Sequence, residues 1–467
     1  MGVIIKYQII LLFILLSSFS WAQYLNPNDY PLITEPTLSY KTNDHNSEGF
    51  LITIDSTIYH FFRQDPGQNG NHVGNGGRIM MRTSLDNGDN WSIPIVLFES
   101  PYDDRNVHGG VTENGRIIVT FRKFDAFAGV HIDYCFMYSD DKAQTWQGPF
   151  TIASEGTSSG TNQIFGNNNI GYYNTIYSAK YCELRHSWDG SNWDSIVYVW
   201  DYRLSNQYKI SEASFTYLGN GVIIGLFRND SGFFGENYFQ VESYDYGLSW
   251  TEPALTNIAD GFFCPSPWIF YEPIFNHVWI IATDRRGNFS QYYEHNQDAI
   301  WLYKLYPDEI VGNPHEYIPF LVFERPNPSF YRFYGYPAST KTPDGNYLVL
   351  FTESQYKIKA EWAYIYQFKI LYHFNPINYF SENNRYSSAL KVFPNPTSQN
   401  LFIPIVRTNE YQISIYNELG QLVFQTIIPK EFGSNYFNVN IESLNSGIYK
   451  CIVQSPKETN VATFVKN

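Results

Sequence analysis

Short apolar stretches alternate with glycine-rich turns along most of the chain. Gly115–Arg122 reads G-R-I-I-V-T-F-R, Gly221–Arg228 reads G-V-I-I-G-L-F-R and Asn346–Thr352 reads N-Y-L-V-L-F-T, with turns such as G-N-G and D-G between such stretches. Short runs of β-branched and aromatic residues bounded by turn signals predict strands rather than helices. His277–Asp284 and Ala299–Tyr306 are predicted strands of the same kind. We therefore expect an all-β chain.

One motif of about eight residues returns along the chain. Its copies are Ser84–Trp91 (S-L-D-N-G-D-N-W), Ser139–Trp146 (S-D-D-K-A-Q-T-W), Ser187–Trp193 (S-W-D-G-S-N-W) and Ser243–Trp250 (S-Y-D-Y-G-L-S-W), and they start 55, 48 and 56 residues apart. An Asp accepts hydrogen bonds from the backbone of its own turn, Gly supplies a positive φ, and Trp covers the hairpin. These Asp residues are therefore predicted to be scaffold residues and not catalytic ones.

The spacing of the copies fits four-stranded blades, each of which buries its faces only by stacking on its neighbours. The pattern S-x-D-x-G-x-x-W at this spacing resembles the Asp-box of the sialidase-like β-propellers, although the second copy has Ala143 in the glycine position and the third is one residue short. The resemblance implies a six-bladed β-propeller over residues 23–376, in which the last two blades carry no copy.

Composition and charge narrow the function classes. Aromatic residues make up 18% of the chain and charged residues 16%, which suits pleated surfaces and is common in carbohydrate-handling proteins. The formal net charge of −14 disfavours binding to nucleic acid or to an anionic membrane surface, and an anionic ligand would need a local cluster of Arg. Four Cys without a C-x-x-C pair fit no metal site and leave disulfide pairing open. We expect no cofactor and no metal.

Residues 1–22 have the parts of a secretory signal peptide. Lys6 lies in a short basic region, an apolar run follows at Ile9–Leu16, and small residues flank Trp21 before Gln23. The apolar run is too short to span a membrane comfortably, and no other stretch approaches that length. We therefore expect signal cleavage and an exported protein with no integral membrane segment in its mature form.

The resemblance to sialidases also implies a particular chemistry. These enzymes use a Tyr nucleophile activated by a Glu, because a carboxylate nucleophile would be repelled by the substrate carboxylate on the anomeric carbon. In the stretch S-E-A-S-F-T-Y-L-G-N-G-V-I-I-G-L-F-R, Glu212 takes the place of this Glu, and Arg228 takes the place of an Arg that binds the substrate carboxylate. In G-Y-P-A-S-T-K-T-P-D-G-N-Y-L-V-L-F-T-E, Tyr336 takes the nucleophile position, and Glu353 the position of a Glu that braces an active-site Arg.

Three Arg bind the substrate carboxylate in this family, since a planar guanidinium pairs with a carboxylate and stays charged. The stretch T-I-Y-H-F-F-R-Q-D resembles the strand that delivers one of them, here Arg63, and T-D-R-R-G-N offers Arg285 or Arg286 as another. Asp65 is the candidate acid/base because it is the Asp that follows Arg63 before the first Asp-box.

Two features depart from the family pattern. The stretch Thr42–Leu51 lacks the Arg and the Pro of the family's R-I-P motif, and Asp65 lies closer to Arg63 than the family places its Asp. Such a site is compatible with binding without sialoside cleavage, or with another acidic or neutral sugar. Further candidates are Asp104 as the acid, His72 as a proton donor, and Arg105 or Arg122 in place of the missing Arg.

The C-terminal region has a different character. A polar linker at residues 377–391 precedes V-F-P-N-P-T at Val392–Thr397, and later come Y-N-E-L-G-Q and S-G-I-Y. These motifs and the basic terminus resemble the type A sorting domain of the Bacteroidetes type IX secretion system, over residues 392–467. The alternative is a generic Ig-like carbohydrate-binding module. Alternating strands predict a small Ig-like β-sandwich, and the resemblance implies export across the outer membrane, with secretion machinery as a partner.

The sequence supports three alternative hypotheses for the function. The first is an exported sialidase-like glycoside hydrolase acting on terminal sugars of glycoconjugates. The second is a different glycan-active propeller enzyme, either another glycosidase or a polysaccharide lyase that uses Tyr with His72 or His108. The third is a non-catalytic glycan-binding or adhesin propeller.

Overall fold

The structure is a computed structural model, in which the chain divides into two compact units. The larger unit is Ile33–His373. The smaller unit combines Phe374–Asn467 with Met1–Leu32. The predicted signal peptide and the linker at 377–391 lie outside the described residues. The described residues are 31–67, 71–153, 158–159, 164–178, 181–201, 210–229, 237–258, 266–284, 297–314, 317, 320–326, 332–357, 360–372, 399–404, 411–417, 421–429, 436–455 and 458–466.

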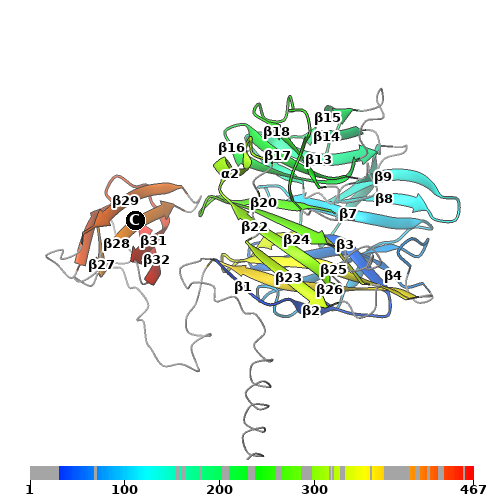
Figure 1. Ribbon diagram of the computed structural model, residues 1–467, viewed down its shortest axis with the longest axis horizontal. Coiled ribbons are helices and arrows are strands. Elements are labelled where there is room, and N and C mark those ends of the chain that lie inside the picture. Colours follow the sequence, from blue (N-terminus) through cyan, green and yellow to red (C-terminus); the bar gives the residue numbers. More distant parts are fainter. Residues whose placement is uncertain are drawn as a thin grey trace, which may run out of the picture. The chain divides into compact units, whose positions relative to one another are not determined.

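Antiparallel strands make up nearly all of the described part of the larger unit (Figure 1). They are β1 (Leu32–Ile33), β2 (Thr37–Tyr40), β3 (His45–Ile54), β4 (Thr57–Asp65), β5 (Arg78–Ser84), β6 (Ile95–Phe98), β7 (Asp103–Val111), β8 (Ile117–Asp125), β9 (Val130–Ser139), β10 (Gln147–Ala153), β11 (Ser158–Ser159), β12 (Phe165–Asn167), β13 (Gly171–Ser178), β14 (Tyr181–Ser187), β15 (Ser195–Asp201), β16 (Ile210–Gly219), β17 (Val222–Asn229), β18 (Phe239–Ser243), β19 (Ala254–Leu255), β20 (Trp268–Glu272), β21 (His277–Asp284), β22 (Gln297–Leu305), β23 (Leu321–Pro326), β24 (Arg332–Lys341), β25 (Tyr347–Lys357) and β26 (Ala360–Leu371). The single described helix, α2 (Pro307–Ile310), is one turn long. The strands predicted at His277–Asp284 and Ala299–Tyr306 correspond to β21 and β22.

Each sheet is a meander in which consecutive strands pair. Three sheets have the strand orders β7 to β10, β16 to β19 and β20 to β23. In a fourth sheet β11 and β12 both pair with β13, β13 pairs with β14, and β14 pairs with β15. A larger sheet joins β24, β25 and β26 to β3, β4, β5 and β6 through one parallel bridge between Ala363 and His45. The N-terminal β2 pairs with β26, so strands from both ends of this unit complete one group.

The first strands of the groups form a closed ring. Strand β3 contacts β7, β7 contacts β11, β12 contacts β16, β16 contacts β20, β20 contacts β24, and β24 contacts β3 again. A closed arrangement of small meanders leaves only short sheet edges open to solvent. It also brings the first strands, which are far apart in sequence, around one centre.

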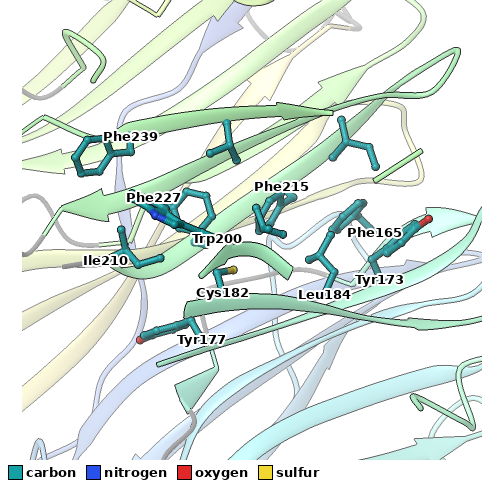
Figure 2. Packing of buried hydrophobic residues seen from close by; sticks show 14 of the residues in the cluster. Phe165, Tyr173, Tyr177, Cys182, Leu184, Trp200, Ile210, Phe215, Phe227 and Phe239 are labelled. Carbon is teal, nitrogen blue, oxygen red and sulfur yellow. The ribbon is translucent and has the colours of Figure 1, made fainter. Parts of the chain in front are cut away.

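The core lies between neighbouring sheets, which explains why the strands read as continuous apolar runs. Ile223 and Phe227 of β17 pack toward β13 and β14, whereas Ile224 and Leu226 pack toward β21. Because side chains alternate across a strand, a strand that is covered on both faces needs apolar residues at successive positions. Figure 2 shows one of these layers, with Phe215, Phe227 and Trp200 in contact.

The repeated motif forms a turn at the end of the third strand of its group. Asp86, Asp141, Asp189 and Asp245 each accept a hydrogen bond from a backbone N–H of the same turn. The motif serine accepts a further backbone N–H, and in the second copy this donor is Ala143, which holds a φ of 66° at the glycine position. The four Asp residues therefore serve their own turns, as the motif predicts.

The described residues of the C-terminal unit form two small sheets. Strands β27 (Asn400–Pro404) and β30 (Tyr436–Asn440) form one. Strands β28 (Tyr411–Asn417), β29 (Leu422–Ile428), β31 (Gly447–Ser455) and β32 (Glu458–Lys466) form the other. One buried cluster draws on both sheets, including Leu401, Val439, Ile413, Cys451 and Phe464, so that the sheets pack on a common core. In the described part of the whole chain, no helix has the length and apolar character needed to cross a membrane.

Candidate functional site

Among the described residues, five non-glycine residues at the ring of first strands have left-handed backbone. Glu48, Asn106, Glu212 and Tyr336 lie in β3, β7, β16 and β24 with φ values of 47°, 53°, 22° and 52°, and Ser266, with a φ of 27°, comes just before β20. The pairing register shifts at Glu48, Asn106, Glu212 and Tyr336, as in a β-bulge. Positive φ is unfavourable for residues other than glycine, and both bulges and such strain gather at functional sites.

These bulges lie at the end of the groups opposite the repeated turns. In β16 the bulge at Glu212 is next to Ser211, which pairs with Arg228 of β17. The repeat begins at Ser243 of β18, which pairs with Ile223 of β17. Ile223 in turn pairs with Tyr217, at the far end of β16. The scaffold motif and the candidate site therefore occupy opposite ends of this group.

Glu48 is a buried carboxylate paired with an arginine from the next group. Its Oε1 lies 3.2 Å from Nη2 of Arg105, and its Oε2 accepts the backbone N–H of Asn106. Burial by itself would raise the pKa of Glu48, but Arg105 and Arg63 lower it to about 2. The same pairing, with a contribution from Asp103, raises the pKa of Arg105 against the effect of burial. Both groups are therefore charged across the ordinary pH range.

Arg63 is fully buried and forms ion pairs with two carboxylates of the protein. Its Nε donates to Oδ1 of Asp103 at 2.8 Å, its Nη2 to Oδ2 of Asp65 at 3.2 Å, and its Nη1 to the carbonyl of Asn71 at 3.1 Å. The side chains of Arg63, Asp65 and Asp103 are all 0% exposed. Asp103 also lies 3.4 Å from Arg105, so that the two arginines and three carboxylates form one network.

Glu212 and Arg228 form the pair that the sequence places across the β16–β17 hairpin. Nη1 of Arg228 donates to Oε2 of Glu212 at 3.0 Å, and the same oxygen accepts the backbone N–H of Ser266 at 2.9 Å. Burial would raise the pKa of Glu212, but Arg228 and Ser266 keep it below its ordinary value. Glu212 is therefore ionised at neutral pH, and Arg228, 22% exposed, is the more accessible partner.

Tyr336 lies in the β24 bulge with its side chain partly exposed. Its charge influences the pKa of Arg105, which places the phenol within electrostatic reach of that guanidinium. Glu353 is buried in β25, opposite Tyr334 of β24. The predicted Arg285 and Arg286 lie outside the described residues.

Several buried polar atoms near these bulges have no hydrogen-bond partner among the described residues. They include both ring nitrogens of His108 and the hydroxyls of Thr120 and Ser47. His108 and Thr120 are cross-strand partners in β7 and β8, and Ser47 precedes Glu48. Burial lowers the pKa of His108 to about 4, partly offset by Glu48 and Glu212, so its ring is neutral and within electrostatic reach of both carboxylates. Buried polar groups are rarely left unpaired in folded proteins, so these atoms point to a polar ligand or water.

The other candidates have defined surroundings. Asp104 hydrogen-bonds to the hydroxyl and backbone N–H of Ser100, and burial raises its pKa to about 7. His72 lies 3.2 Å from His45, ring nitrogen to ring nitrogen. Arg122 contacts His131 through Nη1. No group of three or more His, Cys, Asp or Glu is arranged for a metal ion within the ranges that the structure describes.

The sequence reasoning missed Glu48 and Asp103. A signal for Glu48 was present, because Ser47-Glu48-Gly49 in β3 repeats the Ser-Glu-small pattern of Ser211-Glu212-Ala213 in β16. Nothing local indicates that Asp103 faces Arg63, because the two residues are 40 positions apart.

The ion pair of Glu48 predicts a pH-dependent stability. We expect Glu48→Gln to lower the free energy of unfolding by about 3–5 kcal/mol at pH 7, since it leaves Arg105 buried with less compensation. The folded pKa of about 2 is below the ordinary 4.5, so this stabilisation is full above about pH 4.5 and is lost as the pH falls toward about 2. Urea unfolding of the unsubstituted protein and of Glu48→Gln, between about pH 2 and pH 7, measures this difference in the free energy of unfolding. A difference in the free energy of unfolding that stays constant with pH contradicts the pairing of Glu48 with Arg105. The matched control is Glu252→Gln, at an exposed position.

Comparison with known protein families identifies the tail. Residues 391–467 match the family described as secretion system C-terminal sorting domain. The two-sheet unit is therefore a sorting domain of the type IX kind, and the generic carbohydrate-binding module is not supported. No curated protein matches the chain.

The larger unit has the fold of sialidases. A protein of unknown function from Dyadobacter fermentans is 15% identical, with a TM-score of 0.58 over 73% of this chain and 100% of the other. The NanB sialidase of Streptococcus pneumoniae is 11% identical, with a TM-score of 0.52 over 72% and 70%. The endosialidase of phage phi92 is 10% identical, with a TM-score of 0.53 over 92% and 87%. At these identities the similarity establishes a sialidase-like fold and leaves the activity to the residues of the site.

Proposed function

We propose that the protein is an exported glycoside hydrolase with a six-bladed sialidase-like propeller. The blades begin at β3, β7, β11, β16, β20 and β24, and β2 closes the last one. The observation that carries the proposal is the left-handed backbone along the ring of first strands, in bulges at Glu48, Asn106, Glu212 and Tyr336 and just before β20 at Ser266. The sorting domain supports delivery to the outer surface of the cell or to the medium.

The proposed reaction uses Tyr336 as the nucleophile and Glu212 as its base. The phenol oxygen of Tyr336 attacks the anomeric carbon while its proton passes to Glu212, whose lowered pKa keeps it ionised and able to accept the proton. The bond to the leaving oxygen breaks, and that oxygen takes a proton from an acid. Water then cleaves the tyrosyl glycoside, giving its proton to the same acid, and the phenol recovers its proton from Glu212.

Two carboxyls with pKa values raised by burial compete for the role of the acid, Asp65 and Asp104. Asp103 contacts Arg63 and Arg105, and neighbouring residues of a strand point to opposite faces, so Asp104, bonded to Ser100, faces away from that network. We propose Asp65, whose Oδ2 is bonded to Arg63. Its Oδ1 accepts the backbone N–H of Gly67 at 2.8 Å, and its side chain is 0% exposed.

Release of 4-methylumbelliferone from a panel of methylumbelliferyl glycosides tests the function. We expect the chain without residues 1–22 to turn over at least one sugar of the panel. Failure with every sugar, together with binding to immobilised glycans, would contradict the hydrolase and identify a glycan-binding propeller.

A further inference from the structure

We propose that Ser266 is a positioning residue of the central site, which anchors one oxygen of Glu212 through a strained backbone N–H and stabilises the charge of that carboxylate through its buried hydroxyl. The other oxygen of Glu212, Oε1, is then the atom that accepts the proton of Tyr336. This last step rests on the proposed function, whereas the action of Ser266 on Glu212 does not depend on it.

Ser266 holds an unfavourable backbone conformation. Its φ of 27° lies in the left-handed region, which residues other than glycine seldom adopt and in which Asn is several-fold enriched. The residue is 0% exposed and comes just before β20, so it does not belong to a solvent-exposed turn. Strain of this kind persists only where the surrounding structure holds it, and it gathers at functional sites.

The strained backbone presents its N–H to the proposed base. The N–H of Ser266 donates to Oε2 of Glu212 at 2.9 Å, and Nη1 of Arg228 donates to the same oxygen at 3.0 Å. Among the described residues, both hydrogen bonds of this carboxylate go to Oε2 and none goes to Oε1. Two donors on one oxygen fix the orientation of the carboxylate and leave Oε1 for a proton.

The same arrangement occurs at a second junction between neighbouring groups of strands. Glu48 lies in the bulge of β3, and its Oε2 accepts the N–H of Asn106, the left-handed residue of the next first strand, β7. Glu212 lies in the bulge of β16 and bonds to Ser266 in the same way. At the first junction the left-handed position is an Asn, which tolerates positive φ, whereas at the second it is a Ser. The serine therefore keeps a strain that Asn or Gly would reduce.

The side chain of Ser266 supplies a reason for that strain. Its hydroxyl is buried and makes no hydrogen bond of ordinary geometry among the described residues. Burial raises the pKa of Glu212, while Arg228 first, and then the N–H and the hydroxyl of Ser266, lower it below its ordinary value. A hydroxyl that is buried beside a carboxylate and has no other described partner is available to stabilise the ionised form.

NMR on the mature chain, residues 23–467, tests this contact without turnover. With carbon-13 at the side-chain carboxyl of glutamate, the signal of Glu212 is the one lost in Glu212→Gln, and its chemical shift against pH gives its pKa. With carbonyl-labelled proline and nitrogen-15 serine, only the two Pro-Ser pairs of the chain, at Ser266 and Ser329, give amide signals. We expect the Ser266 amide signal to follow the titration of Glu212 and to stop doing so in Glu212→Gln.

Two variants separate the hydroxyl from the strain. Ser266→Ala removes the hydroxyl and keeps the strained backbone, whereas Ser266→Gly removes both. Each should raise the pKa of Glu212 by about one pH unit, because a hydrogen bond to the ionised form changes proton affinity roughly tenfold. The matched control is Ser214→Ala, which removes another buried hydroxyl from the junction of β16 and β20, where it accepts the N–H of Ile269 at 3.0 Å. This control should leave the pKa of Glu212 unchanged.

The pH dependence of turnover should show the same shift. On the best glycoside, kcat/KM should fall as the pH drops through the pKa of Glu212, which lies below the ordinary 4.5, because a protonated carboxyl cannot accept the proton of Tyr336. In both Ser266 variants this fall should begin about one pH unit higher. Arg228 of β17 and His108 of β7 are the charged or titratable groups described near Glu212, and they are the same in every variant. The unfolding midpoint at each pH shows whether lost turnover is unfolding.

The outcomes distinguish the role of Ser266 from the hydrolase. An unchanged pKa of Glu212 in both variants overturns the inference, and so does an amide signal of Ser266 that ignores the titration of Glu212. A change in Ser266→Gly alone also overturns it, because the effect would then come from the backbone and not from the hydroxyl. A raised pKa in both variants supports the inference even if no sugar is turned over, a result that would contradict only the hydrolase.

Discussion

Tyr336→Phe should abolish hydrolysis while leaving the fold intact. The change removes the hydroxyl that would attack the anomeric carbon and keeps the aromatic ring in the β24 bulge. Loss of a catalytic base alone costs roughly 10²–10⁴-fold in rate, and loss of the nucleophile should cost at least as much. Glu212→Gln should fall within the range for the base, because the amide cannot accept the phenol proton. The measurement is kcat on the best glycoside of the panel, with the midpoint of thermal unfolding recorded for each protein.

The control for this experiment is Tyr246→Phe, which removes the same hydroxyl from a tyrosine that is 47% exposed in a repeated turn. Its activity should match that of the unsubstituted protein. Retention of more than a tenth of the activity by Tyr336→Phe would show that the nucleophile is elsewhere. Because Glu212 also holds Arg228 and Ser266, loss of activity in Glu212→Gln counts only if its unfolding midpoint is unchanged.

Arg63→Met should destabilise the larger unit severely. Asp65 and Asp103 would lose a buried guanidinium that contacts them at 3.2 and 2.8 Å, and removal of one partner from a buried ion pair costs about 3–5 kcal/mol. Asp103 retains a contact with Arg105 at 3.4 Å, so the larger share of the loss should arise at Asp65. Urea unfolding measures the difference. Combining Arg63→Met with Asp65→Asn should recover part of it, because an amide is less costly to bury than an unpaired charge.

The comparison for this prediction is Arg116→Met, which removes an arginine from a pair with Asp140 that is partly exposed to solvent. Exposed pairs contribute about 0–1 kcal/mol, so this variant should unfold almost like the unsubstituted protein. If Arg63→Met keeps its stability and instead loses glycan binding, Arg63 contacts the substrate as the sialidase resemblance implies, and the buried network is not its main role.

The fold was largely predictable because its signals are local. The turn of Ser243–Trp250 is stabilised by bonds between residues up to four positions apart, such as Ser249 N–H to Asp245 at 2.8 Å. Successive apolar positions such as Ile223 and Ile224 predict a strand covered on both faces, and this is observed. The tail was recognised from short motifs, and residues 391–467 do match a sorting domain.

The candidate site was predictable only in part. Glu212 and Arg228 belong to one hairpin, so a local pattern was enough to pair them. The neutralisation of Arg63 and Arg105 was not foreseen, because their partners Asp103 and Glu48 come from other groups of strands, 40 and 57 positions away. The left-handed backbone at Glu48 and Tyr336 also has no local signature, since neither residue favours positive φ.

The sequence by itself therefore determined the strands, the repeated turns, the sorting tail and the identity of the Glu212–Arg228 pair. Only the tertiary structure decided which charges cancel and which polar groups remain available near the ring of first strands. The physical reason is that strand order and turn geometry depend on neighbours along the chain. The charge balance of the site instead depends on side chains that meet only when the ring of first strands closes.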